Sequence, residues 1–253
     1  MKNTFFKEKK KDGSFKKNLA SLLYAIIAAL LIRSFLYEPF SIPSGSMYPN
    51  LKVGDYLFVS KFSYGFSKHS LPFSIPIIPG RLFSKEPERG EIVVFKTPED
   101  NRTDYIKRVV GLPGDLLEMK DNRLIINNKE ISVTKKNVEK YKSFDVSKII
   151  ETLPNKLTYE VYEFEKTFEG LNTNNFSKIK IPIDHFFVLG DNRDNSQDSR
   201  FIGLIPRENL VGRAELVAVS FDVEKGSFLK FWTWYPALRK DRFFVSLIPK
   251  KIE

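Results

Sequence analysis

The feature that most constrains the fold is an uncharged apolar run near the N-terminus. Residues 19–32 carry no charged side chain, and the apolar character continues past Arg33 to Tyr37. A helix needs about 20 apolar residues to cross the hydrocarbon core of a bilayer. A single arginine near one end can extend its charged group to the interface. The sequence therefore predicts one membrane-spanning helix over residues 19–37.

A cleavable leader would share the basic start and the short apolar core. However, residues 33–40 read Arg-Ser-Phe-Leu-Tyr-Glu-Pro-Phe, where a cleavage site would need small side chains. The sequence therefore favours an uncleaved anchor. Residues 1–18 contain seven lysines against Glu8 and Asp12. The positive-inside rule then places this basic N-terminus in the cytoplasm and everything after residue 37 outside.

The net charge of +10 is concentrated at the two ends of the chain, in residues 1–18 and 239–253. Nucleic-acid binding needs a basic surface on the folded domain, and little excess charge is left for the residues between. Basic termini fit the anionic face of a membrane instead. We expect the phospholipid bilayer as a partner and no nucleic acid.

Directly after the apolar run, residues 41–51 read Ser-Ile-Pro-Ser-Gly-Ser-Met-Tyr-Pro-Asn-Leu. The two prolines restrict the backbone, and Gly45 lets another backbone approach closely. A serine hydroxyl in such a segment can act as a nucleophile only if a base lies beside it. The stretch is a candidate reactive segment held close to the membrane.

The available bases narrow the chemistry. The chain has no cysteine, and neither of its two histidines, His69 and His185, lies in a dense polar motif. The chain therefore lacks the residues for a His/Cys metal site and has no well-placed histidine for a Ser-His-Asp triad. Lys107 lies between Tyr-Ile and Val-Val pairs at strand spacing, where burial would lower its pKa and let it accept a proton. The sequence favours a serine of residues 41–51 with Lys107 as its base.

Five ordered segments resemble the bacterial type I signal peptidases, also called leader peptidases. They are Ile-Pro-Ser-Gly-Ser-Met at 42–47, Gly-Asp-Tyr at 54–56 running on to Lys-Phe-Ser-Tyr-Gly at 61–65, Arg-Gly-Glu-Ile-Val-Val-Phe at 89–95, residues 105–115, and Gly-Asp-Asn-Arg-Asp-Asn-Ser-Gln-Asp-Ser-Arg at 190–200. The resemblance covers most of the chain outside residues 66–88, 116–180 and the last thirty.

The resemblance implies a serine endopeptidase that removes signal peptides from exported pre-proteins at the outer face of the bacterial inner membrane, without a cofactor or metal. Ser46 would be the nucleophile and Lys107 the general base, acting through an acyl-enzyme. Ser44 would donate its hydroxyl to the oxyanion together with the backbone N–H of Ser46.

The resemblance also implies supporting residues. Ser196 matches a serine that hydrogen-bonds the lysine, and Asp198 with Arg200 matches an ion pair that supports the segment. Asp191 and Arg193 are expected to be structural. Two shallow apolar pockets for small side chains such as alanine, at the first and third positions before the cut, would be lined by Phe40, Ile42, Pro43, Met47, Leu51, Val94, Tyr105 and Ile106.

The expected fold is mostly β, with a signal-peptidase-like β core, an inserted β-rich subdomain and one N-terminal transmembrane helix. We expect the core to occupy residues 38–115 and 181–253, the second part including the C-terminal tail, and the insertion to occupy residues 116–180. Prolines and serines across residues 66–88 predict a loop, either at the membrane interface or on an ordinary surface. The aromatic cluster at 228–236 predicts an interfacial belt or core packing.

Two other classes of protein fit the sequence less well. A self-cleaving repressor with a Ser/Lys pair would need a DNA-binding helical module where this chain has an apolar run. A catalytically inactive tethered β-rich binding protein is disfavoured because Ser46 and Lys107 are both present. Residues 177–180 also match Ser-x-x-Lys, but the Ser-Asp-Asn and Lys-Thr-Gly segments of penicillin-binding enzymes are missing, so this match is attributed to chance.

Overall fold

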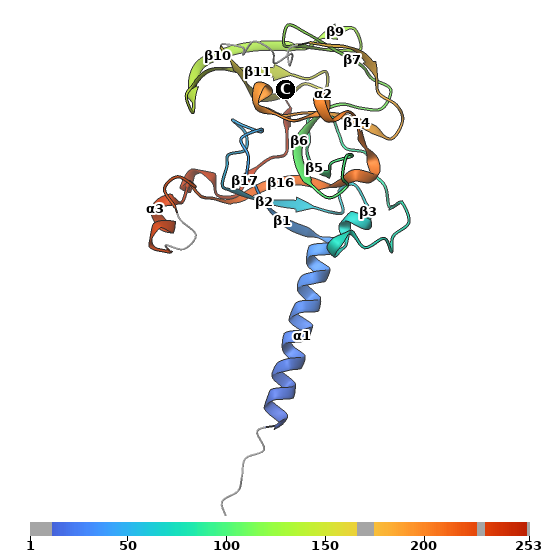
Figure 1. The fold of residues 1–253 in the computed structure, drawn as a ribbon, viewed down its shortest axis with the longest axis vertical. Helices are drawn as coiled ribbons and strands as arrows, with labels where there is room; N and C mark the ends of the chain where they lie inside the picture. The colour runs from blue at the N-terminus through green and yellow to red at the C-terminus, as the bar shows by residue number, and fades with distance from the viewer. Residues whose placement is uncertain (1–11, 166–174, 227–230, 252–253) are drawn as a thin grey trace, which may run out of the picture.

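A computed structural model describes residues 12–165, 175–226 and 231–251. The N-terminal helix α1 (Asp12–Phe35) projects from one end of a β-rich body (Figure 1). Its segment Lys17–Phe35 is long and apolar enough to cross a membrane, and all its side chains except that of Ser34 are exposed. The helix begins within the basic segment predicted as residues 1–18. It ends two residues before the predicted limit because Pro39 follows closely and disfavours helix before it.

An eight-stranded antiparallel sheet, the core sheet, forms the half of the body next to α1. Its order is β1-β2-β16-β5-β6-β14-β15, with β17 pairing with β16 at the side. Its strands are β1 (Tyr37–Ser41), β2 (Asp55–Ser60), β5 (Ile92–Lys96), β6 (Asp104–Gly111), β14 (His185–Leu189), β15 (Ile205–Pro206), β16 (Leu210–Ser220) and β17 (Val245–Ser246).

Two four-stranded sheets form the half of the body away from α1 (Figure 1). One has the order β10-β11-β12-β18 and the other β13-β7-β8-β9. Their strands are β7 (Leu116–Lys120), β8 (Arg123–Ile126), β9 (Lys129–Glu130), β10 (Ser132–Tyr141), β11 (Phe144–Thr152), β12 (Leu157–Phe164), β13 (Phe176–Lys180) and β18 (Lys250–Lys251). We propose residues 116–180 as an inserted subdomain, because β6 precedes them and its partner β14 follows.

The remaining elements are short. Residues 66–88 contain the two-stranded pair β3 (Phe66–Ser67) and β4 (Arg81–Leu82), with 3-10 turns η1 (Lys68–Ser70) and η2 (Pro72–Ser74). Other turns and helices are η3 (Arg193–Asn195), α2 (Ser199–Ile202), η4 (Arg207–Asn209), η5 (Phe231–Thr233), α3 (Trp234–Ala237) and η6 (Lys240–Arg242).

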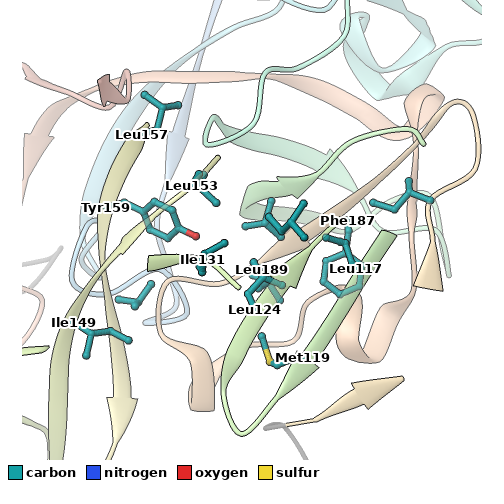
Figure 2. Close-up of a cluster of buried hydrophobic side chains, with 14 residues drawn as sticks. Leu117, Met119, Leu124, Ile131, Ile149, Leu153, Leu157, Tyr159, Phe187 and Leu189 are labelled. Carbon is teal, nitrogen blue, oxygen red and sulfur yellow. The ribbon is translucent and has the colours of Figure 1, made fainter. Parts of the chain in front are cut away.

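The inserted sheets and the core sheet share a continuous apolar core (Figure 2). Leu117, Leu124 and Val161 from the insertion pack in one buried cluster with Phe187 and Leu189 of β14. A second cluster lies beneath β1, β2 and β16, and a third lies between β5, β6 and β14. This shared packing fixes the insertion against the strands that carry the reactive residues.

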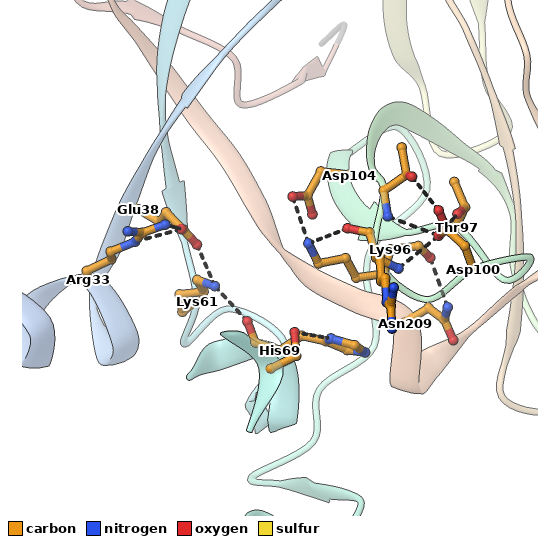
Figure 3. A network of polar contacts seen from close by, with 12 residues as sticks. Arg33, Glu38, Lys61, His69, Lys96, Thr97, Asp100, Asp104 and Asn209 are labelled. Carbon is orange, nitrogen blue, oxygen red and sulfur yellow. Dashed lines mark hydrogen bonds and ion pairs between the residues drawn. The ribbon is translucent and has the colours of Figure 1, made fainter. Parts of the chain in front are cut away.

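The junction between α1 and the core sheet is polar (Figure 3). Glu38 of β1 forms ion pairs with Arg33 at the end of α1 and with Lys61 after β2, both at 2.6 Å. Lys61 Nζ also donates to the carbonyl of His69 at 2.9 Å. One carboxylate therefore joins the helix end, the first strand and the segment 66–88.

Segment 66–88 contacts the end of α1 and presents apolar side chains outward. The rings of Phe35 and Phe66 lie 5.4 Å apart, and Phe73 and Ile77 are exposed. The predicted aromatic cluster at 228–236 is described only from residue 231 on, and Trp232 and Tyr235 there are exposed. Core packing of these two side chains is therefore excluded.

Candidate active site

Ser46 and Lys107 meet at the centre of the molecule. Ser46 lies in the loop between β1 and β2, and Lys107 lies on β6. Lys107 Nζ is 2.8 Å from Ser46 Oγ, although the residues are 61 positions apart. Both are buried, with 4% of Lys107 and 7% of Ser46 exposed. The predicted pair is thus within hydrogen-bonding distance in a poorly hydrated site.

The surroundings of Lys107 favour the neutral amine. Its Nζ also donates to the carbonyl of Ile106 at 2.9 Å, and among the described residues no carboxylate lies within ion-pair distance. Burial lowers the pKa of Lys107 to about 8, and the more distant charges of Asp198 and Asp191 raise it only in part. An uncharged amine beside a hydroxyl can take the hydroxyl proton.

Asp191 is occupied elsewhere. Its carboxylate accepts two hydrogen bonds from the guanidinium of Arg108, at 2.8 and 2.7 Å, and a third from Asn50 Nδ2 at 2.8 Å. Arg108 is the neighbour of Lys107, and its side chain is fully engaged on the far side of the strand. The arginine therefore neutralises the buried acid that could otherwise keep Lys107 protonated.

The backbone around Ser46 is held by Asn192, which follows β14. The Asn192 N–H donates to the carbonyl of Ser46 at 3.0 Å, and Asn192 Nδ2 donates to the carbonyl of Gly45 at 2.9 Å. Asn192 is fully buried. We call these two hydrogen bonds the Asn192 clamp; it ties the serine loop to the segment 190–200.

The segment 190–200 is itself cross-linked. Asp198 caps α2 and pairs with Arg200 at 2.8 Å, as predicted, and its carboxylate accepts the N–H of Gly190 at 2.9 Å. Arg193 forms a buried ion pair with Glu151 of β11. The interpretation of Arg193 as structural agrees with this contact, which binds the segment to the inserted sheet.

Ser196 differs from its prediction. Its hydroxyl is buried and forms no hydrogen bond to Lys107 or to any other described residue. The hydroxyl packs instead against Gly190, where a Cβ would come within 2.1 Å of Ser196 Oγ. The predicted hydrogen bond between Ser196 and Lys107 is therefore absent here.

Ser44 lies beside the reactive serine. Its side chain is exposed, and its Oγ is 3.4 Å from Ser46 Oγ. No described residue accepts the backbone N–H of Ser46. A hydroxyl and a free N–H on adjacent turns can together bind an oxygen that develops negative charge.

An open groove of about 1320 Å³ passes over these residues. Six of the predicted substrate-contacting residues line it, namely Phe40, Ile42, Pro43, Val94, Tyr105 and Ile106. Met47 and Leu51 do not. Both are fully buried in the core beneath the serine loop, because the turn at 43–49 directs them inward. Their interpretation as pocket lining is therefore not supported.

One edge of β6 is open to a substrate strand. β14 pairs with β6 only at residues 108–111, while β5 pairs with residues 104–108 on the other side. Within the described chain, residues 104–107 thus have no partner strand on the groove side. An extended peptide can add to such an edge through main-chain hydrogen bonds.

The two histidines lie away from the reactive pair. His69 is buried in η1, where burial lowers its pKa to about 4, and His185 Nδ1 contacts the carbonyl of Ile183. In the described part of the chain no group of His, Cys, Asp and Glu could hold a metal ion. A serine hydroxyl with a lysine amine beside it is an arrangement that can serve a hydrolase.

Comparison with known proteins agrees with this class. The family described as "Signal peptidase, peptidase S26" matches residues 15–219. The protein named Signal peptidase I of Rickettsia typhi is 39% identical over 255 residues, covering 94% of this chain and 96% of the relative. Signal peptidase I of Rickettsia felis is 39% identical over 249 residues, covering 92% and 93%.

A crystal structure of a signal peptidase I from Enterococcus faecalis is 27% identical and covers 51% of this chain and 97% of that chain, with a TM-score of 0.32. The family match and the two relatives extend over nearly the whole sequence. This chain belongs to the signal peptidase family, peptidase S26.

Sequence reasoning did not single out Asn192, Arg108 or Tyr141. Asn192 lies within the recognised segment 190–200, but nothing local shows that it binds the serine loop. Arg108 could have been paired with Asp191 only by knowing that β6 and β14 are neighbours. Tyr141, which contacts Gly45, comes from the insertion, where no motif drew attention to it.

Proposed function

We propose that this chain is a membrane-anchored serine endopeptidase that removes signal peptides from exported pre-proteins, with Ser46 as nucleophile and Lys107 as general base. The observation that carries the proposal is the 2.8 Å contact between Lys107 Nζ and Ser46 Oγ in a buried site. Family membership supports the reaction class, and α1 supports attachment to a membrane.

The first half of the reaction forms an acyl-enzyme. Neutral Lys107 takes the proton of Ser46 as Oγ attacks the scissile carbonyl. The Ser44 hydroxyl and the Ser46 N–H hold the oxygen that becomes negative. The C–N bond then breaks, and the ammonium of Lys107 returns the proton to the departing amine, which is the new N-terminus of the exported protein.

The second half releases the signal peptide. Water enters in place of the departed amine, and Lys107 takes a proton from it as it attacks the ester carbonyl. Collapse of the second intermediate breaks the ester and returns the proton to Ser46. The lysine must shed a proton in both halves, so its lowered pKa serves each of them.

Substrate choice follows from the groove. The signal peptide adds to the open edge of β6 and lies between residues 40–43 and 105–106. Ile42 and Val94 are buried and Phe40 is half-buried, so they leave shallow pockets. Small side chains, of the Ala-x-Ala type, fit the first and third positions before the cut.

Topology follows from the anchor. We propose that the chain crosses the bacterial inner membrane once, with the basic N-terminus in the cytoplasm and the body on the outer face. The lysines before α1 favour that orientation. It would bring the groove to the side where exported chains emerge.

The test is cleavage of a labelled pre-protein by the purified full chain in detergent. Wild type should release the signal peptide at a single position after a small residue, and Ser46→Ala should not. Near-normal turnover by Ser46→Ala would refute the nucleophile. Cutting at scattered positions would refute the proposed specificity.

A further inference from the structure

The hairpin joining β10 and β11 reaches from the inserted sheets to the active-site groove. Its tip, residues 140–142, lines the same groove as Ser46 and Lys107. Tyr141 is 7% exposed, and its ring lies 5.0 Å from that of Tyr48. A Cβ on Gly45 would come within 2.0 Å of Tyr141 Oη. The hairpin tip therefore packs directly against the residue that precedes Ser46.

The groove has two ends of different surroundings. Arg33 and Glu38 line the end where α1 meets β1, and the hairpin tip lines the other. In Figure 1, β1 lies directly above α1, and β10 and β11 lie on the opposite side of the body. A substrate whose apolar segment sits in the bilayer enters at the α1 end. Residues after the scissile bond then leave past the hairpin.

The hairpin end carries positive charge. Lys142 has no ion-pair partner among the described residues, and its ammonium lies 5.7 Å from the centre of the Tyr141 ring. Lys140 pairs with Asp145 at 2.6 Å, but both side chains are largely exposed. A solvated pair of this kind shields the lysine only partly. Lys142 is the less compensated of the two.

The acidic residues of the groove lie elsewhere. Glu38 is paired with Arg33 and Lys61, and Asp104 is paired with Lys96. Asp222 and Glu224 belong to a turn after β16. Hydrogen bonds join this turn to the side of the groove formed by residues 40–43. There the Phe221 N–H donates to the carbonyl of Gly54, and the Gly54 N–H donates to that of Ile42. This turn therefore flanks the residues that would contact the substrate before the cut.

We propose that residues 140–142 form the leaving-group side of the groove and that Lys142, assisted by Lys140, favours pre-proteins with Asp or Glu just after the cleavage site. The inference rests on the proposed function and deepens it by naming a substrate class. Exposed charge pairs typically change a rate or equilibrium by about two- to fivefold each. The preference is thus a modest selectivity added to the requirement for small residues before the cut.

The experiment uses the full chain in neutral detergent and two pre-proteins that differ only in the second and third residues after the cut, Glu-Glu or Lys-Lys. The ratio of their kcat/KM values is the readout. Wild type should favour Glu-Glu. Lys142→Gln should lower the ratio about threefold, and Lys142→Glu should reverse the preference. About 1 M salt should abolish it, because the screening length falls to about 3 Å.

Two matched variants serve as controls. Lys178→Gln removes an exposed lysine whose Nζ donates to Asn128 on the inserted sheets, and it should leave the ratio unchanged. Glu224→Gln removes charge from the opposite wall and should also leave it unchanged. If Glu224→Gln moves the ratio and Lys142→Gln does not, the leaving-group side has been misplaced and the proposal is wrong.

Failure of the proposed function gives a different result. If wild type cuts neither pre-protein, or if Ser46→Ala cuts both as wild type does, the peptidase assignment falls and the hairpin inference falls with it. If wild type cuts both at equal rates at low salt and Ser46→Ala cuts neither, the peptidase stands and only the hairpin inference is overturned.

Discussion

Two buried lysines show how differently this fold treats the same side chain. Lys61, at the junction of α1 with the core sheet, is 3% exposed, and Lys107 is 4% exposed. Lys61 Nζ lies 2.6 Å from Glu38 Oε2 (Figure 3). Lys107 Nζ lies 2.8 Å from a hydroxyl instead. Burial is the same in both places, and the partner is different.

The partner decides what each lysine can do. Burial lowers the pKa of both, but at Lys61 the carboxylate of Glu38 opposes the shift. The ion pair joins α1 and β1 to the residue that follows β2. At Lys107 the two acids that could play this part, Asp198 and Asp191, are bound by Arg200 and Arg108. A buried lysine becomes a base here because each nearby acid is paired with an arginine.

The largest expected effect is on turnover. Lys107→Met should lower kcat at least about 10⁴-fold, since removing one member of a nucleophile and base pair removes nearly all their joint effect. Lys61→Met, of equal burial, should keep most of the activity of the folded fraction. Single-turnover cleavage of a labelled pre-protein measures both. If both variants lose kcat to a similar extent, Lys107 has no catalytic role that Lys61 lacks.

Next in size is the hydroxyl beside the nucleophile. Ser44→Ala should lower kcat about 100- to 1,000-fold, the usual cost of one oxyanion donor, with little change in KM. Ser44→Thr keeps a hydroxyl and should recover part of the rate. If the alanine variant raises KM and spares kcat, Ser44 binds the substrate and does not stabilise the transition state.

A third effect is the dependence on pH. The base must be unprotonated, so kcat/KM should rise about tenfold per pH unit below the Lys107 pKa of about 8 and level off above it. Lys61→Met should leave the position of this rise unchanged. Initial rates on a substrate without titratable groups near the cut give the profile. A flat profile through neutral pH would exclude Lys107 as the base.

The smallest effect, on stability, should have opposite signs at the two lysines. The folded pKa of Lys107 is below its unfolded value, so holding it charged costs free energy below about pH 8, and this cost disappears toward about pH 10.4. Lys107→Met should therefore raise the free energy of unfolding at pH 7 by about 1–3 kcal/mol, and less at higher pH.

Burial also lowers the pKa of Lys61, so its removal relieves a cost of the same kind. Lys61→Met should nevertheless lower the free energy of unfolding by about 1–3 kcal/mol, because it leaves Glu38 with Arg33 alone and the His69 carbonyl without its donor, and these losses should outweigh the relief. Urea unfolding of both variants in detergent, followed by far-UV circular dichroism, supplies the comparison. Destabilisation by Lys107→Met at pH 7 would mean that this amine contributes an attractive interaction in the fold.

The sequence was most informative where a run of apolar residues or the lack of a suitable histidine left few alternatives. The apolar run predicted α1, and the apolar pairs on either side of Lys107 predicted the strand that is β6. Elimination of the histidines led to the pairing of Ser46 with Lys107. The apolar residues beside Ser46 were less predictable. Met47 and Leu51 face the core and Ile42 lines the groove, a difference set by the turn geometry at 43–49 and not by composition.

Contacts between distant segments could not be predicted. The Asn192 clamp, the pairing of Arg108 with Asp191 and the approach of Tyr141 to Gly45 each join residues more than eighty positions apart. They depend on which strands become neighbours. Ser196 shows the reverse case, since its place in a recognised segment predicted a hydrogen bond that the packing against Gly190 replaces.

The Asn192 clamp has a consequence for synthesis. A growing polypeptide that has passed residue 107 already contains both reactive side chains, but the amide that fixes the serine loop comes 85 residues later, after the whole insertion. Bringing residue 192 back to the serine loop costs chain entropy, and the pairing of β14 with β6 offsets this cost only once both strands are present. A nascent chain halted inside the insertion should therefore lack a fixed serine loop, and the site should form only once the segment that carries Asn192 has been synthesised.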